Sequence, residues 1–281
     1  MTRTIVGRDE AVGALTEQFT AVRTLLGGLD EPQWHTPTVL PGWRVRDVVA
    51  HIIGTESMLL GRPVPEAPEE VTRAAHVRGD IARLNERWIH AMAGATPAQL
   101  LADYDEVIGA RLEALAAMDQ AGFDAESFTP VGPDSYGRFM RIRLFDVWLH
   151  EMDLRDALDL PAEPGGEGGA RGRLAFTEIE QALPMLLARR AQAPDGMLLA
   201  LHLTGDLPTE VFIAVNGRGE RVDKPDREPD LELTMDSSLC VRLAGGRVAP
   251  AKVRDRIAVR AASEDARGWA DRIPAALHFT I

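Results

Sequence analysis

The 281-residue chain has a single cysteine, Cys240, and only two lysines among its 31 basic residues. One cysteine cannot form a disulfide within the chain, and this usage is typical of a reducing compartment, so we expect a cytoplasmic protein. The other basic residues are all arginines. A GC-rich genome explains that bias without any binding role.

Long hydrophobic runs are also missing, since none approaches the roughly 18 residues needed to span a bilayer. The first ten residues lack the apolar core and cleavage site of a signal peptide, and we expect none. Basic residues are outnumbered by 43 acidic ones, which gives a net charge of −12. A chain so acidic has no general attraction to a phosphate backbone, so we expect neither nucleic acid nor membrane as a partner.

The composition that remains, 45% hydrophobic and 26% charged, is that of a globular protein, and the length suits two domains. Strand-type alternation is not evident in the first 160 residues, where apolar residues recur at helical spacing. Helices joined by short loops predict an all-α bundle over residues 1–160. We expect its helices at about residues 8–28, 45–61, 67–93, 96–118 and 134–159.

Residues 161–171 are rich in proline and glycine and are expected to form a linker. Beyond it the pattern changes to short apolar runs between turn signals, so residues 172–281 are predicted to be a small α+β domain. Its expected elements are a helix at 172–191, a hairpin of 197–204 with 210–215, a strand at 231–235, a helix at 237–244 capped by Asp236, a strand at 253–259, a helix at 263–273 and a strand at 278–281.

The predicted helix at 134–159 is apolar around most of its axis, which indicates that it is buried. Nevertheless Asp146, His150 and Asp153 share one face, because residues three and four apart are neighbours on a helix. Buried carboxylates and imidazoles need partners or a metal. A carboxylate and an imidazole four apart can direct two ligand atoms at one ion. The alternative is an Asp–His hydrogen-bonded pair without metal.

His51 is the candidate for a third ligand. It lies at the edge of the apolar stripe of the predicted second helix, where it faces a neighbouring helix rather than solvent. The alternative is an ordinary boundary residue of the core. Glu56 lies at the centre of the same stripe, and we expect it to pair with an arginine of another helix, without a chemical role.

The segment Leu40-Pro41-Gly42-Trp43-Arg44-Val45-Arg46-Asp47-Val48-Val49-Ala50-His51 closely resembles the signature of the mycothiol-dependent maleylpyruvate isomerase family. The resemblance covers most of the chain. It implies a multidomain protein, with an N-terminal DinB-like four-helix bundle that binds metal and a small sterol-carrier-like α+β domain. Gly245-Gly246-Arg247 is similar to a Gly-Arg element of that second domain.

The family binds a divalent metal, usually zinc, and the resemblance implies His51, Asp146 and His150 as the ligands, with Asp153 at a common acidic position. Nickel, iron and manganese also suit this set. Two positions depart from the family pattern. Asp146 stands where glutamate is usual, so its helix must come closer or the carboxylate must act through water. Arg44 replaces a small hydroxyl residue, the type that caps a helix start, so we expect this cap to be lost.

Three protein ligands leave an open position, as in catalytic sites, and a thiol bound there would be deprotonated. Cys240 is far from the ligands in sequence, so we expect an external thiol, and the family's thiol is mycothiol. Its thiolate would add to an electrophilic small molecule. The adduct would then collapse with double-bond isomerisation, as in a cis–trans isomerase, or persist as an S-conjugate, as in an S-transferase.

Arg143 and Arg247 are candidates for holding an acidic substrate or cofactor, the alternative being solvated or ion-paired arginines. Two other functions stay open. One is a non-catalytic small-molecule-binding or regulatory protein, in which Asp146 and His150 form a structural pair. The other is a tailoring enzyme of secondary metabolism that uses the metal without mycothiol. Either a monomer or a homodimer fits the sequence.

Overall fold

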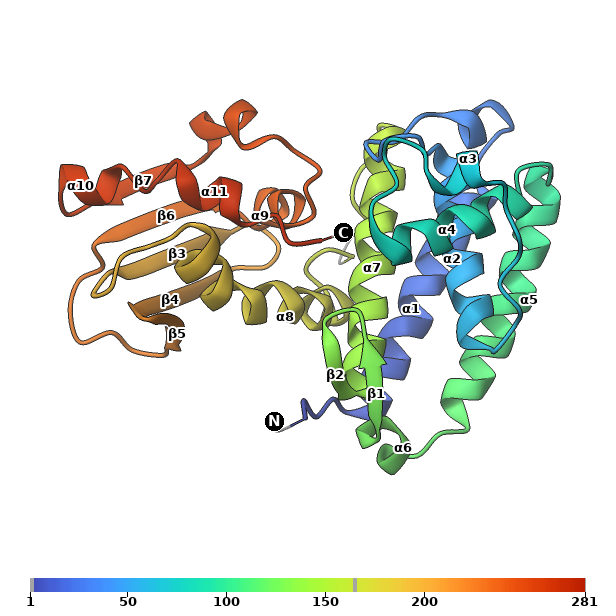
Figure 1. Cartoon of the computed structure of the whole chain (residues 1–281), viewed down its shortest axis with the longest axis horizontal. Coiled ribbons are helices and arrows are strands. Elements are labelled where there is room, and N and C mark those ends of the chain that lie inside the picture. Colours follow the sequence, from blue (N-terminus) through green and yellow to red (C-terminus); the bar gives the residue numbers. More distant parts are fainter. Residues whose placement is uncertain (1–2, 164–165, 281) are drawn as a thin grey trace. The chain divides into compact units, whose positions relative to one another are not determined.

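The structure is a computed structural model that describes residues 3–163 and 166–280. The chain divides into two compact units, Met1–Ala162 and Glu163–Ile281. The first is mainly helical and the second contains a β-sheet, in keeping with the two kinds of sequence pattern (Figure 1). Across the described ranges, every helix falls short of the length or the apolar character needed to cross a bilayer.

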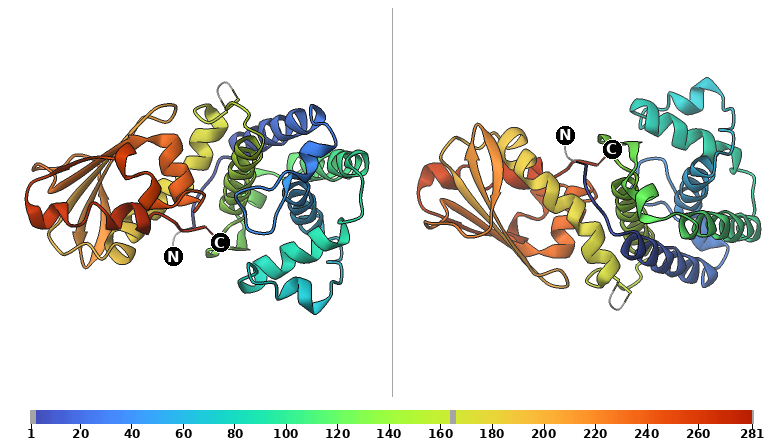
Figure 2. Two further views of the ribbon diagram at one scale, coloured as in Figure 1. Left: turned by 90° about the horizontal axis from the view of Figure 1, so that it is seen from above. Right: turned by 90° about the horizontal axis from the view of Figure 1, so that it is seen from below.

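Four long helices, α1, α2, α5 and α7, form the frame of the first unit. Helix α1 packs against α5 and α7, and α2 packs against α4, α5 and α7; Figure 2 gives two further views. Its elements are α1 (Arg8–Gly27), a 3-10 turn (Pro32–His35), α2 (Val45–Leu59), α3 (Glu69–Thr72), α4 (Gly79–Ala91), α5 (Pro97–Ala116), α6 (Gln120–Asp124), β1 (Glu126–Thr129), β2 (Gly132–Ser135) and α7 (Tyr136–Ala157).

Helix α7 is buried along most of its middle, as its apolar circumference predicts. Leu144, Val147 and Leu154 have no exposed surface. The helix begins at a serine cap, where the Ser135 hydroxyl accepts a hydrogen bond from the backbone N–H of Arg138 at 3.0 Å. The rigid, buried core of α7 is therefore a fixed platform for the polar side chains that it carries.

The prediction that the first unit is all-α is wrong in one respect, because β1 and β2 form an antiparallel hairpin. These four-residue strands contain serine, threonine, proline and aspartate, so they lack the apolar alternation that marks a strand. The single helix predicted at 67–93 is also wrong. It is two helices, α3 and α4, and the second begins at Gly79, whose φ of +83° favours glycine.

The start of α2 keeps half of a capping arrangement despite the arginine at its N-cap. The Arg44 side chain accepts no hydrogen bond, as expected from the loss of a hydroxyl. The Asp47 carboxylate, however, accepts from the backbone N–H of Arg44 at 2.9 Å and from its Nε at 3.0 Å. The chain therefore enters α2 in a defined direction, with Trp43 directly before this capped start.

The second unit is built on a five-stranded sheet in the order β5-β4-β3-β6-β7, and helices α8 and α9 contact it. Only the β3–β6 pair is parallel, with Leu201 opposite Leu233. Its elements are α8 (Ala170–Met185) with a π-helical turn (Leu186–Arg190), β3 (Leu198–Thr204), β4 (Thr209–Asn216), β5 (Arg218–Val222), β6 (Leu231–Asp236), α9 (Ser237–Ala244), two 3-10 turns (Pro250–Lys252 and Arg254–Arg256), β7 (Ala258–Ala261), α10 (Glu264–Arg267) and α11 (Arg272–Ala276).

The predicted hairpin is present as β3 and β4, and Asp236 caps α9 through a 2.9 Å bond from the backbone N–H of Ser238. Strand β5 was not expected. The predicted strand at 253–259 is wrong over residues 253–257, because a 3-10 turn lies there and β7 begins only at Ala258.

The end of the chain also differs from the prediction. The helix expected at 263–273 is split into α10 and α11. Residues 278–280 form no strand, and Ile281 lies outside the described residues. Of the expected linker 161–171, residues 164–165 also lie outside the described ranges, and the last two residues belong to α8.

Candidate metal centre

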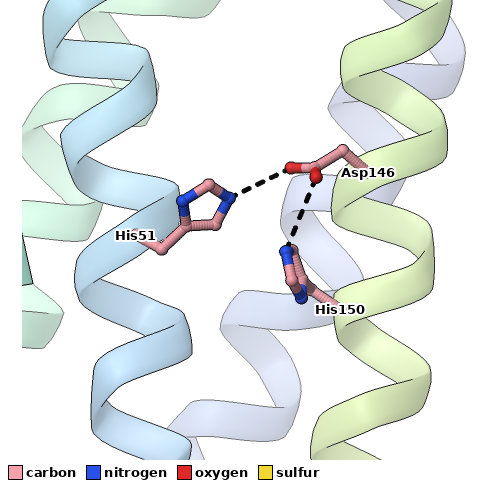
Figure 3. A group of neighbouring side chains, drawn as sticks. All are labelled: His51, Asp146 and His150. Atoms are coloured by element: carbon pink, nitrogen blue, oxygen red, sulfur yellow. Dashed lines mark hydrogen bonds and ion pairs between the residues drawn. The ribbon is translucent and has the colours of Figure 1, made fainter. Parts of the chain in front are cut away.

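His51 on α2 and Asp146 and His150 on α7 lie side by side, with ligand atoms within 4.8 Å of one another (Figure 3). His51 Nε2 is 3.2 Å from Asp146 Oδ2. His150 Nε2 is 3.5 Å from Asp146 Oδ1. The structure therefore brings together the three side chains that the sequence singled out, in a group that can hold a metal ion.

Both histidines are 5% exposed, whereas the Asp146 side chain keeps 34% of its surface. The two imidazoles meet edge to face, with centroids 4.9 Å apart. The indole of Trp43 lies against both rings, at 5.3 Å from His51 and 6.1 Å from His150. The group thus has an aromatic side formed by Trp43, and the Asp146 carboxylate is its most exposed member.

Asp153 holds the far side of the His150 ring. Its Oδ2 lies 2.9 Å from His150 Nδ1, and its side chain is fully buried. A proton on Nδ1 leaves Nε2, the nitrogen that faces Asp146, as the free donor atom, and such outer carboxylates are usual behind metal-binding histidines. Two imidazoles and one carboxylate form a donor set that fits zinc with an open position. His51 Nδ1, by contrast, is buried and has no hydrogen-bond partner within the described ranges.

The pKa values of the three groups shift in different directions. Burial lowers the pKa of His51, although its bond to Asp146 opposes the shift. Burial acts on His150 too, but Asp146 and Asp153 outweigh it and raise the pKa of this ring. Burial alone would raise the pKa of Asp146; the charges of His150 and Arg143 and the hydrogen bonds keep it well below its usual range. The carboxylate is therefore ionised at neutral pH.

Trp43, in the loop before α2, is held in place by a hydrogen bond to a residue of α4. Its indole N–H donates to Glu86 Oε1 at 2.7 Å, and His76 Nε2 lies 3.1 Å from the same oxygen. Gly42 permits this packing, because it has a φ of +84° and a Cβ there would lie 2.7 Å from His76 Cε1. Sequence reasoning assigned no role to Glu86; its position beside Trp88 and Ile89 on a short amphipathic helix was the available signal.

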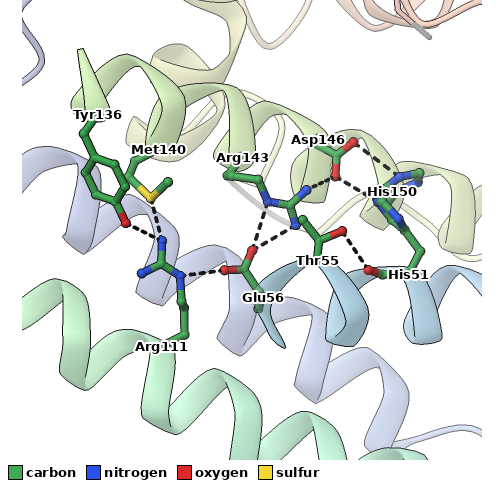
Figure 4. A network of polar contacts seen from close by, with 9 residues as sticks. All are labelled: His51, Thr55, Glu56, Arg111, Tyr136, Met140, Arg143, Asp146 and His150. Carbon is green, nitrogen blue, oxygen red and sulfur yellow. Dashed lines mark hydrogen bonds and ion pairs between the residues drawn. The ribbon is translucent and has the colours of Figure 1, made fainter. Parts of the chain in front are cut away.

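Behind Asp146 a chain of buried ion pairs continues away from the two histidines (Figure 4). Arg143 Nη1 donates to Asp146 Oδ2 at 2.6 Å, and Arg143 Nε donates to Glu56 Oε1 at 3.0 Å. Arg111 Nε donates to Glu56 Oε2 at 2.9 Å, and Arg111 Nη2 to the Tyr136 hydroxyl at 2.7 Å. Glu56 pairs with arginines, as expected. Arg143 shows the ion-paired alternative rather than a free cation.

Arg247 and Cys240 lie in the second unit. Arg247 follows the end of α9, where its Nη1 donates to the carbonyl of Gly245 at 2.5 Å. Its role toward a substrate stays a prediction. Cys240 is inside α9 with no exposed surface, and burial raises the pKa of its thiol to about 12. This thiol is therefore protonated and inaccessible in the folded unit.

A helical unit in which two histidines and a carboxylate converge from neighbouring helices defines a candidate metalloprotein of the helical class. Residues 15–155, which include all three side chains, match the family described as mycothiol maleylpyruvate isomerase N-terminal domain. The match spans half of the chain, and the chain belongs to this family.

Two uncharacterized proteins of Mycobacterium tuberculosis, MT0041 and Rv0036c, are each 30% identical over 136 residues. The alignment covers 48% of this chain and 51% of each relative, so the chain spans about half the length of the curated relatives it matches. Two solved structures, the mycothiol-dependent maleylpyruvate isomerase and a histidine-to-alanine mutant of it, align with a TM-score of 0.57 at 16% identity. They cover 90% of this chain and 93% of theirs, which extends the similarity of fold to the sheet-containing unit.

Proposed function

We propose that this chain is a metal-dependent enzyme that uses mycothiol to act on an electrophilic small molecule, as a cis–trans isomerase or as an S-transferase. The observation that carries the proposal is the convergence of His51, Asp146 and His150. Family membership supports it, because the matched region spans both helices that carry these residues.

The same proposal extends to the fold. We take α1, α2, α5 and α7 as a DinB-like four-helix bundle within residues 1–160, which the packing of α1 and α2 against α5 and α7 supports. We take residues 172–281 as a sterol-carrier-like domain. The mixed five-stranded sheet with helices against it is compatible with that assignment.

In this proposal His51, Asp146 and His150 hold a divalent cation, for which zinc is the best fit to the donor set. When bound, such a cation lowers the pKa of a thiol that coordinates it. Asp153 fixes the His150 ring, and Trp43 excludes water from the histidine side. Asp146, whose side chain is partly exposed, leaves the approach for a small molecule on its own side.

The thiol in this chemistry comes from outside the chain. Cys240 is the only cysteine, and burial holds it protonated. Arg247 remains the candidate for binding an acidic group of substrate or cofactor. Arg143 already contacts Glu56 and Asp146, so we assign it to the ion pairs behind Asp146 rather than to binding an anion.

The test is to purify the protein without a histidine tag and measure its metal content and its isomerase activity with mycothiol and maleylpyruvate. We expect about one divalent ion per chain and activity that a chelator removes and zinc restores. A protein that holds no metal, and takes up none when zinc is added, contradicts the proposal and favours a binding or regulatory protein. Calorimetric titration with mycothiol, with and without metal, distinguishes the proposed enzyme from a tailoring enzyme that uses the metal without mycothiol. The proposed enzyme binds mycothiol when metal is present, and the tailoring enzyme does not bind it.

A further inference from the structure

We propose that Glu56 is a positioning residue for Asp146: it balances the charge of Arg143, so that the Asp146 carboxylate stays available to a cation instead of being held by the guanidinium. This inference rests on the proposed metal site. It concerns residues on α2, α5 and α7 that lie behind the candidate ligands and do not belong to them.

The geometry links the four side chains in a row of alternating charge, from Asp146 through Arg143 and Glu56 to Arg111 (Figure 4). Glu56 receives Arg143 on one oxygen, with Nε at 3.0 Å and Nη2 at 2.9 Å, and Arg111 on the other oxygen at 2.9 Å. Only Arg143 reaches Asp146 as well, at 2.6 Å. Two carboxylates and two guanidiniums make the row neutral.

Burial makes this balance matter. The Glu56 and Arg111 side chains are each 3% exposed and Arg143 is 6% exposed, so water screens their charges poorly. An arginine beside a metal ligand opposes the binding of a cation in two ways. It repels the ion, and it competes with the ion for the carboxylate, here through Oδ2 of Asp146. A second carboxylate on the same arginine reduces both effects.

Substitutions of Glu56 and of Arg111 therefore have different expected effects on cation binding. Glu56→Gln removes the balancing charge and leaves Arg143 with Asp146 as its remaining carboxylate in the row, so binding weakens. Arg111→Gln frees the charge of Glu56 to act on Arg143 alone, so binding is unchanged or tightens. A role in packing alone would make both substitutions weaken binding, because each one breaks the same buried pair.

The experiment titrates Co²⁺ and Zn²⁺ into the metal-free full chain and measures affinity, with the visible spectrum of bound Co²⁺ as a report on ligand geometry. We expect Glu56→Gln to weaken affinity by about tenfold, the usual scale for an outer carboxylate. Arg111→Gln should bind no more weakly than the unsubstituted protein, and the double substitution should recover part of the loss.

Asp134→Asn is the matched control. It removes another carboxylate that is paired with an arginine, Arg138, in the same unit but outside this row. It should lower thermal stability without changing Co²⁺ affinity. Equal affinity of Glu56→Gln and the unsubstituted protein, or weaker binding by Arg111→Gln, overturns the inference. If Glu56→Gln does not fold, the Co²⁺ affinity of Arg111→Gln decides: an affinity equal to or tighter than that of the unsubstituted protein supports the inference, and a weaker one overturns it. If the unsubstituted protein binds neither ion, the proposed function itself fails.

Discussion

His150 uses its two ring nitrogens for two different carboxylates: Nδ1 lies 2.9 Å from Asp153 Oδ2, and Nε2 lies 3.5 Å from Asp146 Oδ1. Asp153 is fully buried and Asp146 is partly exposed. The contact with Asp153 therefore fixes the His150 ring on its buried side, and the contact with Asp146 lies on its more exposed side. This division of roles leads to the first prediction.

Asp153→Asn should weaken Co²⁺ affinity by about tenfold to a hundredfold, because the amide holds the Nδ1 proton of His150 less strongly. The measurement is a Co²⁺ titration followed in the visible spectrum. Asp156→Asn, an exposed position on the same helix, is the control and should bind normally. Normal binding by Asp153→Asn would show that this carboxylate does not support the ring.

His51→Ala should abolish metal binding while leaving the helical content largely intact, since α2 is held by apolar neighbours such as Val48 and Ile52, which have no exposed surface. Metal analysis and far-ultraviolet circular dichroism of the same sample test both parts. His90→Ala, an exposed histidine on α4, should retain the metal. A His51→Ala protein that still binds metal would remove His51 from the ligand set.

Cys240 should not react with a thiol reagent in the folded protein at pH 8, because burial removes access and raises the pKa of the thiol to about 12. In strong denaturant, the same reagent should detect the single cysteine of the chain. Cys240→Ala should keep any mycothiol-dependent activity. Loss of that activity in a folded variant would point to the chain's own thiol as the nucleophile.

Acid should destabilise the first unit through Asp134. Burial would raise the pKa of this carboxyl, but bonds from Arg138, Thr4 and Ser135 outweigh it and lower the pKa below the usual value near 4. A folded-state pKa that is lowered gives stability above the unfolded-state pKa, and this stability is lost as pH falls toward the folded-state value.

Asp134→Asn should therefore lower the free energy of unfolding by about 1.5–3 kcal/mol at pH 7, the range for a hydrogen bond to a charged group. Denaturant unfolding at pH 7 and at pH 3 is the measurement, and the difference between variant and parent should shrink at pH 3. A constant difference between the two pH values would rule out the carboxylate charge as its source.

The sequence was sufficient to predict helices where the apolar pattern was long and regular. Apolar periodicity predicted α1, α2, α5 and α7, and the spacing of Asp146 and His150 predicted their shared face. The short elements were not predicted from this periodicity. The hairpin of β1 and β2 has no apolar alternation, and the break before α4 depends on the backbone conformation of one glycine, Gly79.

Contacts between distant segments account for the rest. The Glu86 carboxylate that holds the Trp43 indole lies 43 positions away, and nothing in either segment identifies the other. Arg111 lies on the buried side of α5 together with Val107 and Leu115, so an arginine at an apolar position was the only sign of its pairing with Glu56. Such partners follow from how helices pack, which local patterns do not specify.

The candidate ligands come from helices that are far apart along the chain, with 95 positions between His51 and Asp146. An ion bound by both would act as a cross-link that closes this long loop, and it would favour the folded chain by mass action. The supply of metal in the cell would then set the lifetime of the folded first unit as well as its chemistry.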